Sequence, residues 1–411
     1  MGKTVVVGAG IIGTALAYEL QKRGRNVALI DPDTPGSGAS YGNMASIAVT
    51  EFMPVARLSI WRQMPGWLLH PQGPIVVRPS YLPRLIPWVA RFLAASRPSR
   101  VRALETAGAT LCQRSLADMR VLLGEIGLDD HISDTGCLSL YANDAEFRSD
   151  AERFDMLDRY GFSYQILDRT QIEDLEPGIG TQITKAVLLP DNRTVRDPFA
   201  IVTRLGDRFK AAGGTVERAR VTGFERTNRI SGVRFETGSM LDADEVVLCT
   251  GAFTGRLSRF LNEPMPLETE RGYHTQVMDP GLDLKHSIIW PAKAFMVSPT
   301  AGGIRIGGTV EMAGLDAAPN YQRAKITVKR ARTALPDLKM QETSEWMGHR
   351  PAFPDTIPLM SASVKTPGVF YSTGHGHLGL TYAATNAVLM ADLITGAKPV
   401  LDMSPYSITR F

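Results

Sequence analysis

The first thirty residues hold two short apolar runs on either side of a stretch with helical periodicity. Residues 4–7 are mostly β-branched and end at Gly8, whereas apolar side chains recur at helical spacing over residues 11–22, before Gly24. A second apolar run, residues 27–30, ends at Asp31. This pattern predicts a strand, a helix and a second strand parallel to the first, joined by a right-handed crossover.

The rest of the chain alternates between helical and strand-like segments and contains no internal repeat. Apolar periodicity predicts helices at residues 101–127, 144–160, 198–212, 324–335 and 380–394. Short apolar or alternating runs predict strands at residues 136–141, 215–221, 246–248 and 369–372, a hairpin over 224–235, and antiparallel strands at 265–278, 294–297 and 304–309. The middle of the chain therefore inserts an α+β region into an α/β pattern.

Residues 52–96 mix Trp, Leu, Ile and Pro with scattered arginines. No run reaches the roughly 18 apolar residues of a membrane span, so we expect no bilayer crossing here. Two interpretations stay open. We favour helices packed on a domain surface over an amphipathic patch that lies on a membrane.

Length and composition narrow the class of protein. A chain of 411 residues exceeds the usual size of one hydrophobic core, so two domains are expected. A net charge of +3 with 21% charged residues is ordinary for a globular protein, and the dense basic patches of a nucleic-acid binder are missing. Cys112, Cys137 and Cys249 lie far apart, which indicates neither a disulfide framework nor a zinc site. The apolar residues at the N-terminus are followed by a glycine motif and not by the cleavage site of a signal peptide. We therefore expect a cytoplasmic protein, and we leave open a peripheral contact with the inner face of the membrane.

A glycine motif lies between the first strand and the first helix. It follows the pattern G-x-G-x-x-G and consists of Gly8, Ala9, Gly10, Ile11, Ile12 and Gly13. Its glycines allow a tight turn, a close approach of a pyrophosphate and close helix–strand packing, while the helix N-terminus faces the phosphates. Asp31 stands at the end of the second strand, where it can bind a ribose hydroxyl. A purely structural glycine turn would leave Asp31 unexplained, so the sequence predicts dinucleotide binding, without separating FAD from NAD.

Several further motifs are spread over nearly the whole chain. They are G-A-S-x-G-N at residues 38–43, T-G at 250–251, R-G-Y at 271–273, G-x-R-P-x-x-P-D at 348–355 and G-H-G-x-L-G-x-T at 374–381. With them the chain resembles the D-amino-acid oxidase superfamily of flavoproteins, and especially its bacterial D-amino-acid dehydrogenase branch. The resemblance implies an FAD-binding α/β domain of the Rossmann-like, glutathione-reductase type, with an α+β substrate domain built on an antiparallel sheet. We expect residues 1–80, 191–262 and 345–411 in the first domain, and 81–190 and 263–344 in the second.

The same resemblance implies a set of cofactor contacts outside the glycine motif. The residues expected at FAD are Ser40, Gly42, Asn43, Met44, Val221, Thr250, Gly251, Gly374, Gly376, His377, Leu378, Gly379, Leu380 and Thr381. Backbone N–H groups from Leu378 to Thr381, at a helix N-terminus, can stabilise negative charge on a reduced flavin. No cysteine occurs in residues 350–355, where sarcosine oxidases attach their flavin, so the FAD is expected to be non-covalent.

The resemblance also implies how a substrate binds. Arg350 would hold a substrate carboxylate through a two-pronged hydrogen bond, and Tyr273 would close the pocket. Arg350 in a surface ion pair and Tyr273 as an ordinary strand tyrosine are the alternatives. His349 and His377 are candidate acid–base groups, although the family's reaction, hydride transfer from a neutral amine to flavin N5, needs little such help. Arg305 faces either the pocket or solvent, because strand alternation does not decide between them.

The function implied is FAD-dependent oxidation of a small amino acid or secondary amine. D-amino acids, hydroxyproline-like imino acids and N-substituted glycines are the candidate substrates, and the imine product would hydrolyse in water. Oxygen or a quinone would accept the electrons. A flavin monooxygenase, an NAD-linked dehydrogenase and a non-catalytic or partner-dependent flavoprotein subunit are the alternatives.

Overall fold

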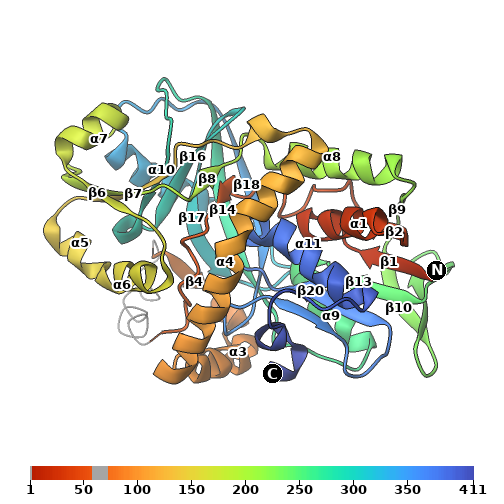
Figure 1. The fold of residues 1–411 in the computed structure, drawn as a ribbon. Coiled ribbons are helices and arrows are strands. Elements are labelled where there is room, and N and C mark those ends of the chain that lie inside the picture. Colours follow the sequence, from red (N-terminus) through yellow and green to blue (C-terminus); the bar gives the residue numbers. More distant parts are fainter. Residues whose placement is uncertain (1, 58–72) are drawn as a thin grey trace.

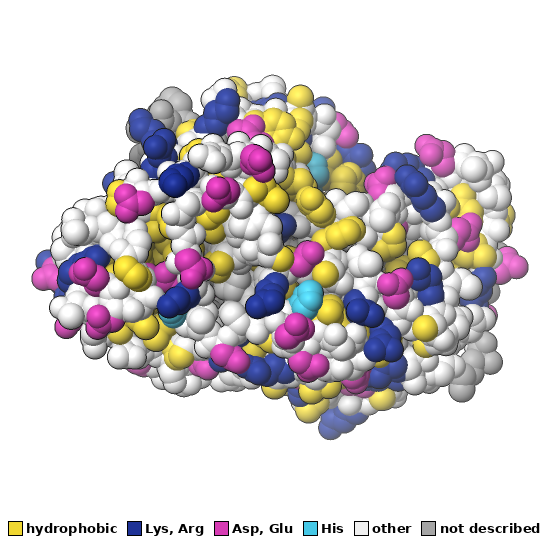
Figure 2. Space-filling view, turned by 90° about the horizontal axis from the view of Figure 1, so that it is seen from above, with side chains coloured by type: hydrophobic (Ala, Val, Ile, Leu, Met, Phe, Trp, Pro, Cys, Tyr) yellow, Lys and Arg dark blue, Asp and Glu magenta, His cyan; other side chains and the backbone are white. Residues whose placement is uncertain are grey.

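A computed structural model describes residues 2–57 and 73–411 of the chain (Figure 1). Trp61 and Trp67, which contributed to the interpretation of residues 52–96, lie outside the described residues. Within the described ranges, every helix is too short or too polar to span a bilayer. Figure 2 shows acidic and basic side chains interspersed over one face of the molecule, in agreement with the small net charge.

The glycine motif belongs to a six-stranded sheet. Five of its strands are parallel, and β19 pairs antiparallel to β20 at one edge. The order is β19 (Leu359–Ala362), β20 (Val369–Thr373), β13 (Glu245–Leu248), β1 (Lys3–Val7), β2 (Asn26–Asp31) and β9 (Thr215–Arg218).

Helices and a small sheet cover the two faces of this six-stranded sheet. The helices, which pack against one another, are α1 (Ile11–Lys22), α8 (Pro198–Ala211) and α11 (Gly379–Thr395). The small antiparallel sheet is β10 (Val221–Arg226), β11 (Ile230–Phe235) and β12 (Met240–Asp242), whose apolar residues share a core with β1, β2 and β13. The predicted strand–helix–strand unit at the N-terminus is confirmed.

A nine-stranded mixed sheet forms the other half of the molecule. Its order is β18 (Gln341–Ala352), β14 (Glu268–Asp279), β17 (Gly303–Met312), β16 (Phe295–Thr300), β15 (Ser287–Trp290), β5 (Cys137–Tyr141), β7 (Lys185–Leu189) and β6 (Gln165–Leu167), with β4 (Ile75–Val77) beside β17. Helix α10 (Gln322–Ala334) packs its apolar side on one face of the sheet. The opposite face of β14, β17 and β18 meets residues 42–44, next to the glycine motif.

The remaining helices surround these two sheets. They are α3 (Leu82–Ala95), α4 (Pro98–Ile126), α5 (Asp144–Ser149), α6 (Ala151–Tyr160), α7 (Arg169–Leu175) and α9 (Thr254–Phe260). A short ladder joins β3 (Ser46–Ile47) to β8 (Arg193–Thr194). The long helix α4 crosses the middle of the molecule and packs against α11 (Figure 1).

Three sequence predictions differ from the structure. The helix predicted over 144–160 breaks at Asp150 into α5 and α6. The strand predicted over 215–221 divides between two sheets, because β9 ends at Arg218 and β10 begins at Val221. Strand β18 was not predicted, since residues 341–345 are polar and exposed. Its pairing with β14 places residues 345–352 in the nine-stranded sheet rather than with the cofactor segments.

Candidate active site

The turn between β1 and α1 is so tight that two of its positions have no room for a side chain. Gly8 has a φ of +104°, and a Cβ atom there would press on the backbone carbonyl of Cys249. A Cβ atom on Gly13 would collide with the carbonyl oxygen of Gly8, so α1 packs directly on the turn. The amide of Ile11, in the first turn of the helix, donates to the Ser40 Oγ at 2.9 Å. This turn fits the pyrophosphate of a dinucleotide, which needs exposed amides and no intervening side chain.

Asp31 lies beside this turn. Its two carboxylate oxygens accept hydrogen bonds from the amides of Ala9, at 2.7 Å, and Asp33, at 2.9 Å. Burial raises the pKa of Asp31, and the two amide hydrogen bonds oppose that rise. A cavity of about 320 Å³ is lined by Pro32, Arg218, Ala219, Arg220, Phe235, Glu236 and Thr237. Asp31 and Val221 each adjoin one of these residues in the chain, so the cavity lies close to the position where the sequence predicts ribose and adenine contacts.

Two more glycines, one after β13 and one in the C-terminal motif, have free space beside their backbone. Together with the turn at residues 8–13 and the N-terminus of α11 we call them the cradle. Gly251 and Gly376 have φ values of +53° and +55°, and a Cβ atom on either would meet no other atom within 4 Å. Thr373 Oγ1 donates to the Gly251 carbonyl at 2.9 Å, which holds the ends of β13 and β20 together. By contrast, a Cβ atom on Gly374 would strike the ring of Phe353. The two open glycines thus border free space, while Gly374 is required for packing.

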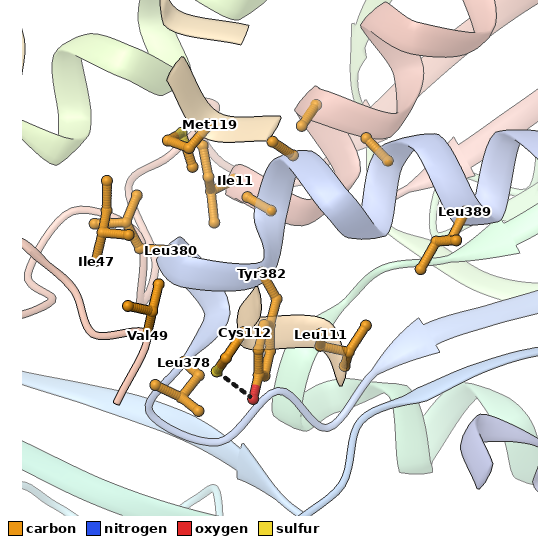
Figure 3. Close-up of a cluster of buried hydrophobic side chains, with 14 of the residues drawn as sticks. Ile11, Ile47, Val49, Leu111, Cys112, Met119, Leu378, Leu380, Tyr382 and Leu389 are labelled. Atoms are coloured by element: carbon orange, nitrogen blue, oxygen red, sulfur yellow. Dashed lines mark hydrogen bonds between the residues drawn. The ribbon is translucent and has the colours of Figure 1, made fainter. Parts of the chain in front are cut away.

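The N-terminus of α11 is anchored in the main apolar core. Leu378 and Leu380 are buried among side chains from α1, α4 and residues 47–49 (Figure 3). Thr381 Oγ1 accepts from the amide of Ala48 at 2.9 Å. The amide of Leu378 bonds to the His375 carbonyl, so the free amides of the first turn belong to Gly379, Leu380 and Thr381. These three amides form the part of the predicted set that can stabilise an anionic ring.

Residues 42–44 are clamped against the nine-stranded sheet. His274 Nδ1 lies 2.9 Å from the Gly42 carbonyl oxygen, and Arg305 Nη1 donates to the Asn43 carbonyl at 2.6 Å. Met44 packs its sulfur against Gly307. Arg305 therefore faces the interior rather than solvent, and burial lowers its pKa. We call this side of β14, β17 and β18, which carries His274 and Arg305, the inner face.

Trp346 completes the inner face beside His274. The two rings stack with centroids 5.2 Å apart and an interplanar angle of 24°. A Cβ atom on Gly42 would collide with the indole, so Gly42 is needed for the loop to approach the sheet. Burial, and to a smaller extent the nearby charge of Arg305, lowers the pKa of His274 to about 4. His274 and Trp346 were not predicted, although His274 follows Gly272 by two positions and so shares its face of the strand.

Arg350 also lies on the inner face. Its guanidinium covers Gly272, where a Cβ atom would press on it, and its one hydrogen bond to a described residue is a long contact of 3.5 Å from Nη1 to the Thr309 carbonyl. No carboxylate among the described residues comes within 4 Å of it. Burial lowers the pKa of Arg350, and the charge of Glu270 opposes that shift. A nearly unpaired guanidinium beside the cofactor loop suits an anionic ligand.

Tyr273 and His349 lie on the opposite face, because side chains alternate along β14 and β18. The Tyr273 hydroxyl donates to Glu311 and accepts from the amide of Asn320 at 3.0 Å. His349 Nδ1 lies 2.9 Å from the Thr269 Oγ1, and burial lowers the His349 pKa to about 4. The side chains of Tyr273 and His349 thus lie on the face of the strands opposite to Arg350, whereas the sequence analysis expected them beside it.

His377 differs from the other two candidate residues. Its side chain is exposed, yet it lies among enough protein atoms that burial lowers its pKa. Glu51 raises the pKa of His377 and Arg350 lowers it. The amide of Gly376 donates to the Pro351 carbonyl at 2.8 Å, which brings the segment that carries His377 next to the segment that carries Arg350. The described residues contain no group of three or more His, Cys, Asp or Glu side chains that could hold a metal ion.

Comparison with known proteins identifies the family. Residues 3–393 match the model of the FAD dependent oxidoreductase family that includes D-amino-acid oxidase. The chain belongs to this family. A D-amino-acid oxidase of Bradyrhizobium diazoefficiens is 33% identical over 99% of this chain and 98% of its own length. A D-amino acid dehydrogenase of Methylobacterium nodulans is 29% identical, covering 100% of this chain and 99% of its own.

The solved structures agree at the level of the fold. Glycine oxidase from Geobacillus kaustophilus superimposes with a TM-score of 0.78 at 20% identity, covering all of both chains. The protein is an FAD-dependent amino-acid oxidoreductase, and the cradle from Gly8 to Thr381 fits its cofactor. The dinucleotide predicted from the glycine motif is FAD rather than NAD.

Proposed function

We propose that the enzyme oxidises a small amino acid or secondary amine whose carboxylate lies on Arg350. The observation that carries this proposal is the Arg350 guanidinium, which lies on the inner face without a carboxylate partner among the described residues. A planar guanidinium binds a carboxylate through two parallel hydrogen bonds. The curated relatives are named D-amino-acid oxidase and D-amino acid dehydrogenase, which supports D-amino acids as the first candidates to test.

In this proposal, the bound flavin supplies the acceptor, at N5, for the hydride that leaves the substrate's α-carbon. The chain supplies orientation. Arg350 fixes the carboxylate, and the first turn of α11 directs its free amides toward developing negative charge. His377 borders the site, whereas His349 and Tyr273 do not take part. The imine formed would hydrolyse after release, and either oxygen or a quinone would take the electrons from the reduced enzyme.

The test is anaerobic bleaching of the flavin absorbance by a panel of amino acids. The panel contains D- and L-amino acids, hydroxyprolines, sarcosine and iminodiacetate. Bleaching by one class identifies the substrate, and readmitted air then separates oxygen from a quinone as the acceptor. An FAD-loaded protein that no member of the panel bleaches contradicts the proposal.

Arg350→Ala tests the carboxylate contact itself. The substrate concentration for half-maximal flavin reduction should rise roughly 100-fold, because two charge-assisted hydrogen bonds are lost. Arg256→Ala is the matched control, since Arg256 forms an exposed ion pair with Asp316. FAD content, measured by absorbance after denaturation, should stay at the wild-type level in both variants. Equal half-saturation in Arg350→Ala and wild type would reject the carboxylate contact.

A further inference from the structure

We propose that Glu270 is the second binding group for the substrate, receiving the α-ammonium group of an amino acid whose carboxylate lies on Arg350. This inference rests on the proposed function and adds to it a residue that selects amino acids over other carboxylic acids. It predicts that the site recognises a zwitterion through two opposite charges.

Glu270 and Arg350 are direct partners on neighbouring strands. They oppose each other in the antiparallel register of β14 and β18, so both side chains project from the inner face. Cβ atoms of such partners lie about 5 Å apart. The Arg350 guanidinium leans along the sheet over Gly272, and no ion pair with Glu270 forms within 4 Å. Two opposite charges thus face the same space without touching.

Glu270 has no partner among the described residues, in contrast to the carboxylates around it. Glu268, two positions earlier on the same face, accepts from the Tyr81 hydroxyl at 2.8 Å, and Glu311 is held by Arg78, Tyr273 and Arg271. Burial raises the pKa of Glu270, and only the charge of Arg350 opposes this. A partly enclosed carboxylate without hydrogen bonds is unfavourable. A cationic ligand would satisfy it.

An α-amino acid can bridge two opposite charges that lie more than 4 Å apart. Its carboxylate carbon and its nitrogen are both bonded to the α-carbon and lie about 2.5 Å apart. With a hydrogen bond of about 2.8 Å at each end, the molecule can bridge groups roughly 5 to 8 Å apart. A carboxylic acid without an amine would leave Glu270 unpaired and bring a second negative charge toward it. The pair therefore favours binding of a zwitterion, whose ammonium group gives up one proton before hydride leaves the α-carbon, and it fixes two of the four substituents of the α-carbon.

The experiment is calorimetric titration of the FAD-loaded enzyme with 2-aminoisobutyrate and with pivalate. The two probes have the same shape, with an ammonium group in one and a methyl group in the other. Both are achiral and neither has a hydrogen on the α-carbon, so neither can be oxidised. Wild type should bind 2-aminoisobutyrate more tightly. Glu270→Gln should weaken that binding about 10-fold or more, because a charged hydrogen bond is lost, and should leave pivalate binding unchanged or tighter.

Two further variants make the result decisive. Glu268→Gln removes the same charge from the same face but from a carboxylate that Tyr81 already holds, so it should leave the preference unchanged. Glu270→Asp keeps the charge and should retain part of the preference. The proposal is overturned if wild type shows no preference for 2-aminoisobutyrate, or if Glu270→Gln weakens both probes equally.

Failure of this inference can be told from failure of the proposed function. Calorimetric binding needs no turnover, so a zwitterion preference lost in Glu270→Gln would stand even if no amino acid bleached the flavin. Conversely, amino acids could bleach the flavin in a way that depends on Arg350, while Glu270→Gln and wild type bind the two probes with equal affinities. That result would reject only the role of Glu270.

Discussion

Strands β14 and β18 expose charged side chains on both faces of the sheet, and two pairs of opposite charges there, Arg271 with Glu311 and Arg350 with Glu270, differ in whether they touch. On the face toward α10, Arg271 bonds to Glu311 at 3.3 Å, and Arg78 reaches the same carboxylate at 2.7 Å. On the inner face, Arg350 and Glu270 have no such partner among the described residues. Buried charges that satisfy one another hold a fold together, whereas charges left open can bind a ligand.

Loss of the central carboxylate of the paired face should have the largest effect. Glu311→Gln leaves the buried guanidinium of Arg271 without a compensating charge, which costs about 3–5 kcal/mol of unfolding free energy. Urea unfolding of the FAD-loaded protein measures this loss. Glu345→Gln, an exposed change on β18, should alter stability by no more than about 0.5 kcal/mol. Wild-type stability in Glu311→Gln would contradict a structural role for the cluster.

Tyr273→Phe should have a smaller effect, confined to the same face. It removes the hydroxyl that bridges Glu311 and the Asn320 amide, and should cost about 1–2 kcal/mol. The substrate concentration for half-maximal flavin reduction should not change, because Tyr273 faces away from Arg350. A large rise in that concentration without loss of stability would contradict this assignment and would indicate that Tyr273 contacts the substrate.

The effect that is smallest at neutral pH concerns the inner face and grows only on acidification. The pKa of His274 is lowered to about 4 in the folded protein, from about 6.5 for an unfolded histidine. Between these values the unfolded chain binds the extra proton, so stability falls as the pH falls from 6.5 toward 4. His274→Gln should reduce the slope of unfolding free energy against pH by roughly 1 kcal/mol per pH unit in this window. Identical slopes in variant and wild type would show that His274 does not titrate in this way.

The sequence predicted the cofactor half of the molecule better than the substrate half. The motif from Gly8 to Gly13 is local, and its glycines are required by contacts that lie within one strand–helix turn or directly beside it. Strand β18 lacks such a signal, because its first five residues are exposed and only its pairing with β14 makes it a strand. Local pattern was therefore enough for the first region and insufficient for the second.

The site residues show the same limit. The R-G-Y motif at residues 271–273 indicated the right strand but not which side chain faces the substrate. The answer depends on Gly272, since the guanidinium of Arg350 lies over it and a Cβ atom there would have to displace that group. Arg271 and Tyr273 then project to the other side. Glu270 belongs to none of the sequence motifs. It was identified as a candidate site residue only from its pairing with Arg350 in the register of β14 and β18.

The clamp on residues 42–44 couples the two halves of the enzyme through the cofactor. His274 and Arg305 hold carbonyl groups of a loop whose neighbour, Ser40, contacts the first turn of α1. Because the loop is bonded to both sheets, we expect FAD bound beside it to raise the unfolding free energy of the nine-stranded sheet as well as that of the six-stranded sheet, although the nine-stranded sheet lacks the glycine motif.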